Sequence, residues 1–253
     1  MDIVKHNQKA WNCEVENGND ATIPVSIDDI EEARNGEWSL FLSIPYEWLG
    51  DVRNKDILCL ASGGGQQGPI LAAAGSNVTV FDNSPAQLHQ DEIVAKNNNL
   101  LIHLEQGDMR DLSAFSDSSF DIIIQPISNH FVDEVQSVWK ECYRVLKSEG
   151  VLIATFWNPI NYLFDIDKWN HSKELVVRYK IPYSDMNQLP KERLSDYISN
   201  NEPLEFGHSL ESQIGGQIKA GFLIGGFIES SFENDLLTSI IDTVITTKAI
   251  KPL

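Results

Sequence analysis

Residues 60–75, LASGGGQQGPILAAAG, decide the fold prediction. The apolar run at 56–60 precedes them and predicts a short buried strand. Residues 66–74 predict a helix that ends at Gly75. Residues 63–68 also satisfy the pattern G-x-G-x-x-G, in which a tight turn brings the backbone close to a ligand. A lone match of this kind is weak and does not identify the ligand.

The same alternation of strand and helix continues along the chain. Ser84 and Pro85 begin a helix, and apolar positions at helical spacing from Val132 to Leu146 predict another, closed by Gly150. Strands that alternate with helices form a parallel sheet through right-handed crossovers. Further strands are predicted at 77–81, 101–104, 120–124 and 151–156, and, after a helix at 208–220, a closing pair at 221–229 and 240–248.

Composition argues against several classes of partner. The 253 residues carry a formal net charge of −18, without a run of Lys or Arg. Nucleic acids and anionic membrane surfaces are therefore poor partners, because both require neutralising basic side chains. The three cysteines, Cys13, Cys59 and Cys142, lack a C-x-x-C spacing, and the six histidines are scattered. We therefore expect no metal site and a cytoplasmic protein without a signal peptide or membrane span.

The chain divides into four predicted segments. Residues 1–49 are polar and form a helical or irregular lid, and residues 50–156 form the ligand-binding core. The strand–helix alternation breaks at 157–206, which we interpret as a loop-like insertion covering one edge of the sheet on the acceptor side. Residues 207–253 supply the last helix and strand pair.

Five stretches follow one another along the chain: 57–65 (ILCLASGGG), 80–84 (VFDNS), 107–109 (GDM), 120–123 (FDII) and 143–152 (YRVLKSEGVL). In their order and spacing, over roughly residues 50–156, the chain resembles the class I S-adenosylmethionine-dependent methyltransferases. The resemblance implies a Rossmann-like, doubly wound α/β fold with a seven-stranded, mostly parallel sheet and a C-terminal antiparallel pair. It also implies S-adenosylmethionine as cofactor and S-adenosylhomocysteine as product.

The first of these stretches departs from the family at two positions. Cys59 stands where the family has an acid, and Ala61 where it has the first loop glycine. The resemblance implies that Ala61, Gly63 and Gly65 let the backbone approach the methionine and ribose of the cofactor. A purely structural tight turn is the alternative for these glycines.

The resemblance assigns the remaining contacts to loops that follow the strands. Asp82 would bind the ribose hydroxyls, and Asn83 would lie against the adenine. Asp108 would accept the adenine amino proton, and the N–H of Met109 would meet a ring nitrogen. Gln125 would face the cofactor from the other side. The alternatives are a helix-capping acid for Asp82 and a turn acid for Asp108.

The acceptor side is less well defined by the sequence. The loop at 126–130 borders the acceptor in the resembled family, and His130 either takes a proton from the methylated atom or packs at a helix start. The aromatic residues of the lid and insertion form either an acceptor pocket or the small core of the cover. They are Trp11, Trp38, Trp48, Trp157, Tyr162, Phe164, Trp169, Tyr179 and Tyr183.

Three functions are consistent with these residues. The first is methyl transfer from S-adenosylmethionine to a small-molecule acceptor by in-line displacement, with a protein acceptor left open. The second is an NAD(P)-dependent oxidoreductase, which explains the glycines and Asp82 but not the GDM stretch at 107–109. The third is a non-catalytic S-adenosylmethionine-binding protein. The sequence predicts neither the acceptor atom nor the oligomeric state.

Overall fold

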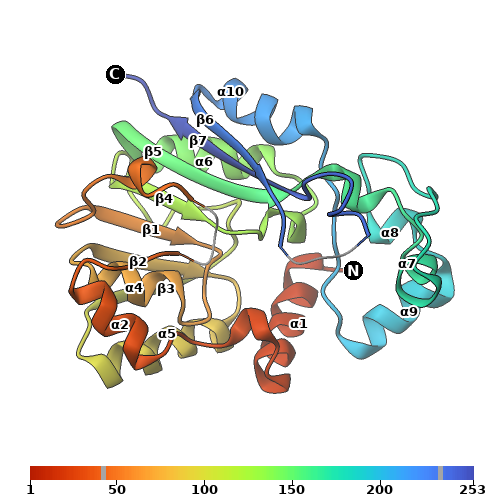
Figure 1. Cartoon of the computed structure of the whole chain (residues 1–253), viewed down its shortest axis with the longest axis horizontal. Helices are drawn as coiled ribbons and strands as arrows, with labels where there is room; N and C mark the ends of the chain where they lie inside the picture. Colours follow the sequence, from red (N-terminus) through yellow and green to blue (C-terminus); the bar gives the residue numbers. More distant parts are fainter. Residues whose placement is uncertain (41–43, 233–235) are drawn as a thin grey trace.

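A single mixed sheet organises the molecule (Figure 1). The computed structural model describes residues 1–40, 44–232 and 236–253. Within these residues seven strands lie in the order β3-β2-β1-β4-β5-β7-β6. The first five are parallel, and β7 is antiparallel to both β5 and β6, which confirms the predicted fold class. The strands are β1 (Asp56–Leu60), β2 (Asn77–Asp82), β3 (Ile102–Gln106), β4 (Phe120–Gln125), β5 (Leu146–Trp157), β6 (Leu223–Ser230) and β7 (Val244–Ile250).

Helices cover both faces of the sheet. On one face α4 (Gln67–Ala73) packs Ile70 and Leu71 against Ile57 and Cys59 of β1, beside α2 (Ile27–Arg34), α3 (Tyr46–Leu49) and α5 (Pro85–Asn98). On the other face α6 (Gln136–Val145), beside α10 (Gly216–Ala220), packs against Leu58 and Leu60. The alternation of β1 side chains between the two cores follows from the period of two in a strand. The sheet is therefore doubly wound.

The strand order reverses direction at β1, which pairs with β2 on one side and β4 on the other. Connections leave this point toward opposite faces, so a crevice opens at the carboxyl ends of the strands. The loops that follow β1, β2, β3 and β4 meet at this edge. The glycine loop, Asp82, the GDM stretch and Gln125 therefore come from segments that the topology brings together.

The N-terminal segment is more regular than a loop. Helix α1 (Ile3–Asn17) begins at the cap residue Asp2 and ends at Gly18, and η1 (Asp20–Thr22) follows it. Asn83, just after β2, donates from Nδ2 to the Val4 carbonyl at 2.9 Å, and Gln8 donates to the Asn83 carbonyl at 2.9 Å. These bonds hold α1 across the carboxyl ends of the strands (Figure 1). No helix in the described part of the chain is both long and apolar enough to cross a membrane.

The insertion after β5 corrects the prediction of a loop-like segment, because it is partly helical. It contains η3 (Pro159–Tyr162), α7 (Ile166–Ser172), α8 (Asp185–Gln188) and α9 (Lys191–Asn200). Figure 1 shows these helices beyond the carboxyl ends of the strands, not along the edge strands β3 or β6. The helices escaped prediction because they are short, and α9 buries no residue, so no apolar stripe marks it.

Gly150 corrects a second prediction, because it does not close the helix before it. Helix α6 ends at Val145 and β5 begins at once, so Gly150 lies inside the strand. A Cβ there would lie 2.8 Å from the Lys147 carbonyl oxygen, which explains the glycine without a helix end. The helix predicted at 208–220 is also shorter: one π-type turn (Glu211–Gly215) leads into α10.

Candidate active site

A cavity of about 230 Å³ lies at the strand reversal. We call it the switch-point cavity; the glycine loop, the loops after β2, β3 and β4, and α1 form its walls. Three predicted site residues, Gly65, Gln125 and His130, are not among those that line it. The six that do are Ala61, Gly63, Asp82, Asn83, Asp108 and Met109.

The glycine loop is shaped by close contact with α5. A Cβ on Gly63 would lie 2.7 Å from the Cβ of Gln87, and Gly64 has a φ of +115°. Ala61 adopts the left-handed region with a φ of 47°, where an L-residue with a Cβ is strained. Gly68 lies against β2, since a Cβ there would sit 2.6 Å from Val80. The spacing of the glycines therefore serves both a tight turn and close helix–strand packing.

Gly65 is turned away from the switch-point cavity by the segment after η1. Val25 donates from its N–H to the Gly65 carbonyl at 3.0 Å, and a Cβ on Gly65 would lie 3.0 Å from Pro24. Gln66 donates to the carbonyls of Ala21 at 3.2 Å and Ile23 at 3.0 Å. The glycine at 65 thus allows the N-terminal segment to cross the loop.

Asp82 is the last residue of β2 and holds the loop that follows β1. Its Oδ2 accepts the N–H of Gly63 at 2.9 Å, and its Oδ1 accepts that of Ser84 at 2.8 Å. Burial raises the pKa of the carboxyl, while these backbone donors act in the opposite direction. The N-cap of α5 is Ser84, not Asp82. Asp82 therefore orders the cavity wall rather than the helix end.

Asp91 of α5 is a site residue that sequence reasoning missed. It is fully buried, its Oδ2 accepts the N–H of Gly64 at 3.0 Å, and its Oδ1 has no hydrogen-bond partner among the described residues. Burial, reinforced by the charge of Asp82, raises its pKa to about 8. The signal was an acid on the buried stripe of α5, between Leu88 and Ala95.

Asp91 lies near Cys59, the position at which this chain lacks the acid of the resembled family. The Cys59 side chain is fully buried in β1, and burial together with the nearby Asp91 raises the pKa of the thiol, which is therefore neutral. The family's strand acid is absent here, yet a carboxylate still receives an N–H of the glycine loop. That carboxylate comes from α5 rather than from β1.

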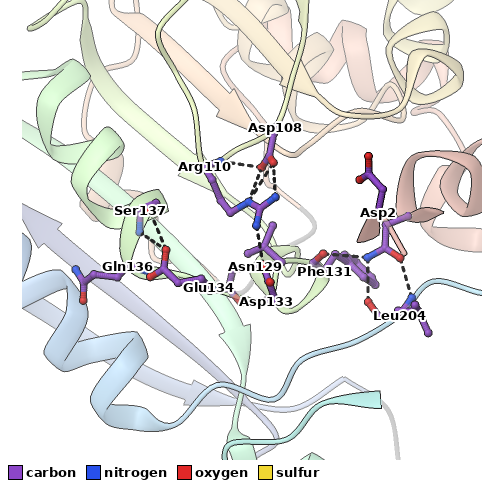
Figure 2. Close-up of polar contacts among 12 residues, drawn as sticks. Asp2, Asp108, Arg110, Asn129, Phe131, Asp133, Glu134, Gln136, Ser137 and Leu204 are labelled. Carbon is purple, nitrogen blue, oxygen red and sulfur yellow. Dashed lines mark hydrogen bonds and ion pairs between the residues drawn. The ribbon is translucent and has the colours of Figure 1, made fainter. Parts of the chain in front are cut away.

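Asp108 is clamped by a neighbour that the sequence did not suggest. Arg110 donates from Nη2 to Asp108 Oδ2 at 2.6 Å and from Nη1 to Asp133 at 2.6 Å. Figure 2 shows the guanidinium lying between the two carboxylates. The backbone N–H of Arg110 also reaches Asp108 Oδ1 at 3.0 Å, so the acid stabilises its own turn.

Gln125 lies beneath the cavity rather than in its wall. It is fully buried, donates from Nε2 to the sulfur of Met109 at 3.6 Å, and leaves its Oε1 without a hydrogen-bond partner among the described residues. Met109, 8% exposed, is the residue of this pair that reaches the cavity. Gln125 therefore supports Met109.

His130 is buried beside the cavity. Its ring lies 3.9 Å from that of Phe131 between centroids, and Nδ1 has no partner among the described residues. Burial, with a smaller contribution from His208, lowers its pKa to about 3, so the imidazole is neutral at physiological pH. The loop does reach the cavity, but through Ser128 and Phe131.

Helix α1 forms one wall of the switch-point cavity, in which Asn7 is the most strongly hydrogen-bonded residue of the helix. Its Nδ2 donates to the carbonyls of Phe131 and Leu204, each at 2.9 Å, and its Oδ1 accepts the Leu204 N–H at 2.9 Å. Trp11 packs edge-on against Phe131, with 5.1 Å between ring centroids. One buried amide therefore ties together α1, the loop after β4 and the segment at Leu204.

Comparison with known proteins identifies the family. The model of a methyltransferase domain matches residues 58–154. A Bacillus subtilis (strain 168) protein described as "Uncharacterized methyltransferase YbaJ" is 48% identical over 253 residues, covering 98% of each chain. The chain belongs to the class I S-adenosylmethionine-dependent methyltransferases. The predicted family, enzyme class and cofactor are confirmed, against the nicotinamide-dependent alternative.

More distant proteins resemble this methyltransferase as well. A demethylmenaquinone methyltransferase of Tropheryma whipplei (strain Twist) is 26% identical over 170 residues, covering 65% of this chain and 61% of its own. A crystal structure of an S-adenosylmethionine-dependent methyltransferase from Mesorhizobium loti superposes with a TM-score of 0.61 at 17% identity. It covers 81% of this chain and 94% of its own. At that identity the superposition supports the fold alone.

The residues of the switch-point cavity fit the cofactor of this methyltransferase family. Gln87 lines the cavity and its buried Oε1 has no hydrogen-bond partner among the described residues. A carboxylate at the end of β2 and close-lying backbone at Gly63 stand beside it. Acceptors for hydroxyl and amino groups therefore share the cavity with apolar walls from Trp11 and Phe81.

Proposed function

We propose that this enzyme transfers a methyl group to a small-molecule acceptor at the α1 side of the switch-point cavity. The observation that carries the proposal is the closure of that side by Asn7, which bonds both the loop after β4 and the segment at Leu204. An enclosed acceptor side favours a small molecule over a polymer. The net charge of −18 also disfavours nucleic acid.

Different residues of the cavity would bind different parts of the cofactor. We assign the ribose hydroxyls to Asp82, the adenine edge to Asn83, Asp108 and the Met109 N–H, and the methionine end to the backbone at Ala61 and Gly63. Arg110 fixes Asp108, because its guanidinium spans Asp108 and Asp133. We assign Gly65 and Gln125 to support of the loop and of Met109, since neither lines the cavity.

The bound cofactor supplies a methyl group on a sulfonium, which is a good leaving group. The protein's part is then to align the acceptor and exclude water, and positioning of this kind contributes many orders of magnitude to a rate. Trp11 and Phe131 form the apolar wall that excludes water. We assign no proton transfer to His130, because its pKa of about 3 and its place outside the cavity make it a poor base.

The test measures S-adenosylhomocysteine release with different classes of acceptor. Purified enzyme is incubated with S-adenosylmethionine and either a fraction of small metabolites or the matching protein and RNA fractions. Release with the small-molecule fraction alone is expected. Release that requires the protein or RNA fraction would contradict the acceptor class.

We further propose a cytoplasmic location, on the odd number and spacing of the cysteines.

A further inference from the structure

A second cavity, of about 360 Å³, lies under the insertion, and we call it the aromatic cavity. Its walls are rings, chief among them Trp157, Tyr162, Trp169, Tyr179, Tyr183 and Tyr197. The Tyr162 and Tyr183 rings stack at 5.4 Å between centroids, and Tyr179 meets Tyr183 edge-on at 5.2 Å. The six aromatic residues predicted in the insertion therefore surround a space, whereas Trp11 lines the switch-point cavity and Trp38 and Trp48 pack against the core beside β1. None of the residues lining this cavity lines the switch-point cavity.

The charged side chains that line the aromatic cavity are both acidic. Among the described residues Asp185 and Glu205 are the two, and no described Lys, Arg or His lines the cavity. Asp185 accepts the hydroxyl of Tyr183 at 2.7 Å and the N–H of Glu205 at 2.7 Å. Burial raises the pKa of Asp185 and, with the charge of Asp185 adding to it, that of Glu205 to about 7. The cavity therefore carries two carboxyl groups that form no ion pair among the described residues, although the charge of Arg193 acts in the direction of lowering the pKa of Asp185.

Backbone pairing fixes these two acids side by side. Residues 183–185 run beside residues 205–207: Tyr183 and Gly207 exchange N–H to carbonyl bonds of 2.8 and 3.1 Å, and Asp185 donates to the Glu205 carbonyl at 3.1 Å. A Cβ on Gly207 would lie 2.5 Å from the ring of Tyr162, so that ring rests directly on the backbone. Backbone hydrogen bonds therefore fix the main chain at Asp185 and Glu205, and the Tyr162 ring packs directly against the same backbone.

The nearby arginines are engaged elsewhere. Arg178 pairs with Asp165, and its guanidinium lies 5.6 Å from the Tyr179 ring centroid. Arg193 pairs with Asp167 and donates to the Tyr197 hydroxyl at 3.2 Å. Neither arginine lines the cavity, and in the described part of the chain neither Asp185 nor Glu205 forms an ion pair. A positive charge would complete the aromatic cavity.

We propose that the aromatic cavity binds an organic cation, an amine or a quaternary ammonium compound. Ring faces attract such cations through their quadrupoles, and Asp185 and Glu205 supply the opposite charge. An inorganic cation fits less well, because most of the wall is apolar and the described residues contain no group of three or more His, Cys, Asp or Glu side chains placed to hold a metal ion. The proposal does not rest on the acceptor class, because the cavity is separate from the site that holds the cofactor.

The test compares a cation with its neutral isostere. Choline and 3,3-dimethylbutan-1-ol have nearly the same shape and differ in charge, and benzyltrimethylammonium adds a ring. Binding to the full chain is followed by calorimetry and by tryptophan fluorescence, since Trp157 and Trp169 line the cavity. Saturable binding of at least one cation is expected, with the neutral alcohol roughly ten-fold weaker or more. Equal binding of choline and the alcohol, or no binding of either cation up to about 10 mM, would overturn the proposal.

Variants separate this site from the cofactor site. Glu205→Gln keeps the shape of the side chain and should weaken cation binding roughly ten-fold, whereas exposed Glu192→Gln on α9 should leave it unchanged. Asp82→Asn should lose S-adenosylhomocysteine affinity and keep cation binding. Unchanged cation affinity in Glu205→Gln would refute the assignment even if the enzyme still binds its cofactor.

Discussion

A pair of neighbouring acids stands at each cavity: Asp82 lines the switch-point cavity with Asp91 close to it, whereas Asp185 and Glu205 both line the aromatic cavity. At the switch point, Asp82 and Asp91 receive backbone N–H groups from the glycine loop and the start of α5. In the aromatic cavity, Asp185 receives a tyrosine hydroxyl and one N–H, and burial together with the charge of Asp185 raises the pKa of its neighbour Glu205. The first pair is thus held by backbone N–H groups of the chain itself, whereas the second pair faces a cavity in which no described cation pairs with it. A carboxylate can thus serve as a structural anchor or as one half of a binding site.

The most direct way to break this comparison is Asp82→Asn. We expect roughly a hundred-fold loss of S-adenosylhomocysteine affinity, about 3 kcal/mol, because a charged acceptor at the ribose is lost while the shape stays. Calorimetric titration measures it, with circular dichroism to confirm folding. Exposed Asp28→Asn on α2 is the matched control. An affinity within a factor of about three of the parent would remove Asp82 from the ribose site.

Asn7→Ala removes the amide that joins α1 to Phe131 and Leu204. The variant leaves the Leu204 N–H and the carbonyls of Phe131 and Leu204 without their partner, and unpaired buried groups cost roughly 1–3 kcal/mol each. We expect the free energy of unfolding to fall by about 3 kcal/mol in urea titration. Lys9→Ala, on the exposed side of α1, should change it by less than about 0.5 kcal/mol. Similar losses in both variants would show that Asn7 has no special role.

Asp91→Asn sharpens the comparison through pH. The folded pKa of about 8 lies above the ordinary value, so the folded protein keeps a proton that the unfolded chain releases. Stability of the parent therefore falls as pH rises through that interval, while Asn stays neutral and can still accept the Gly64 N–H. Relative to the parent, the variant should gain roughly 2 kcal/mol between pH 6 and 8.5. Urea midpoints at the two pH values measure it, and a difference that does not change with pH would contradict it.

Ala61→Gly has the smallest expected effect. The φ of 47° strains an alanine, and glycine relieves that strain at the cost of a more flexible unfolded chain. We expect a net gain of about 0.5 kcal/mol in unfolding free energy. Ala114→Gly, an exposed alanine without a positive φ, should lose stability under the same conditions. Loss in both variants would mean that the Ala61 methyl contributes more by packing than it costs in strain.

The switch-point cavity was the more predictable of the two because its parts are local. Strands β1, β2 and β4 are short and largely apolar, the glycine loop follows β1, Asp82 ends β2, and Asp108 lies two residues after β3. Asp91 could have been found from its place on the buried stripe of α5, but Asn7 could not, because its partners Phe131 and Leu204 lie far along the chain.

The aromatic cavity could be predicted only as a choice between pocket and core. Its rings come from segments between Trp157 and Phe232 that meet through tertiary contacts, without a periodic pattern to align them. His130 shows the same limit. Its residue type suggested proton transfer, whereas burial, which a sequence does not reveal for a single histidine, lowers its pKa to about 3.

The extended segment at residues 204–207 contacts residues of both cavities. Leu204 is bonded to Asn7 in the wall of the switch-point cavity, Glu205 lines the aromatic cavity, and Phe206 donates to the His130 carbonyl at 2.7 Å. This one extended segment therefore contributes to both cavities, and a displacement of it would alter the shape of both. By thermodynamic reciprocity, whatever an occupant of one chamber does to affinity in the other is returned in equal measure.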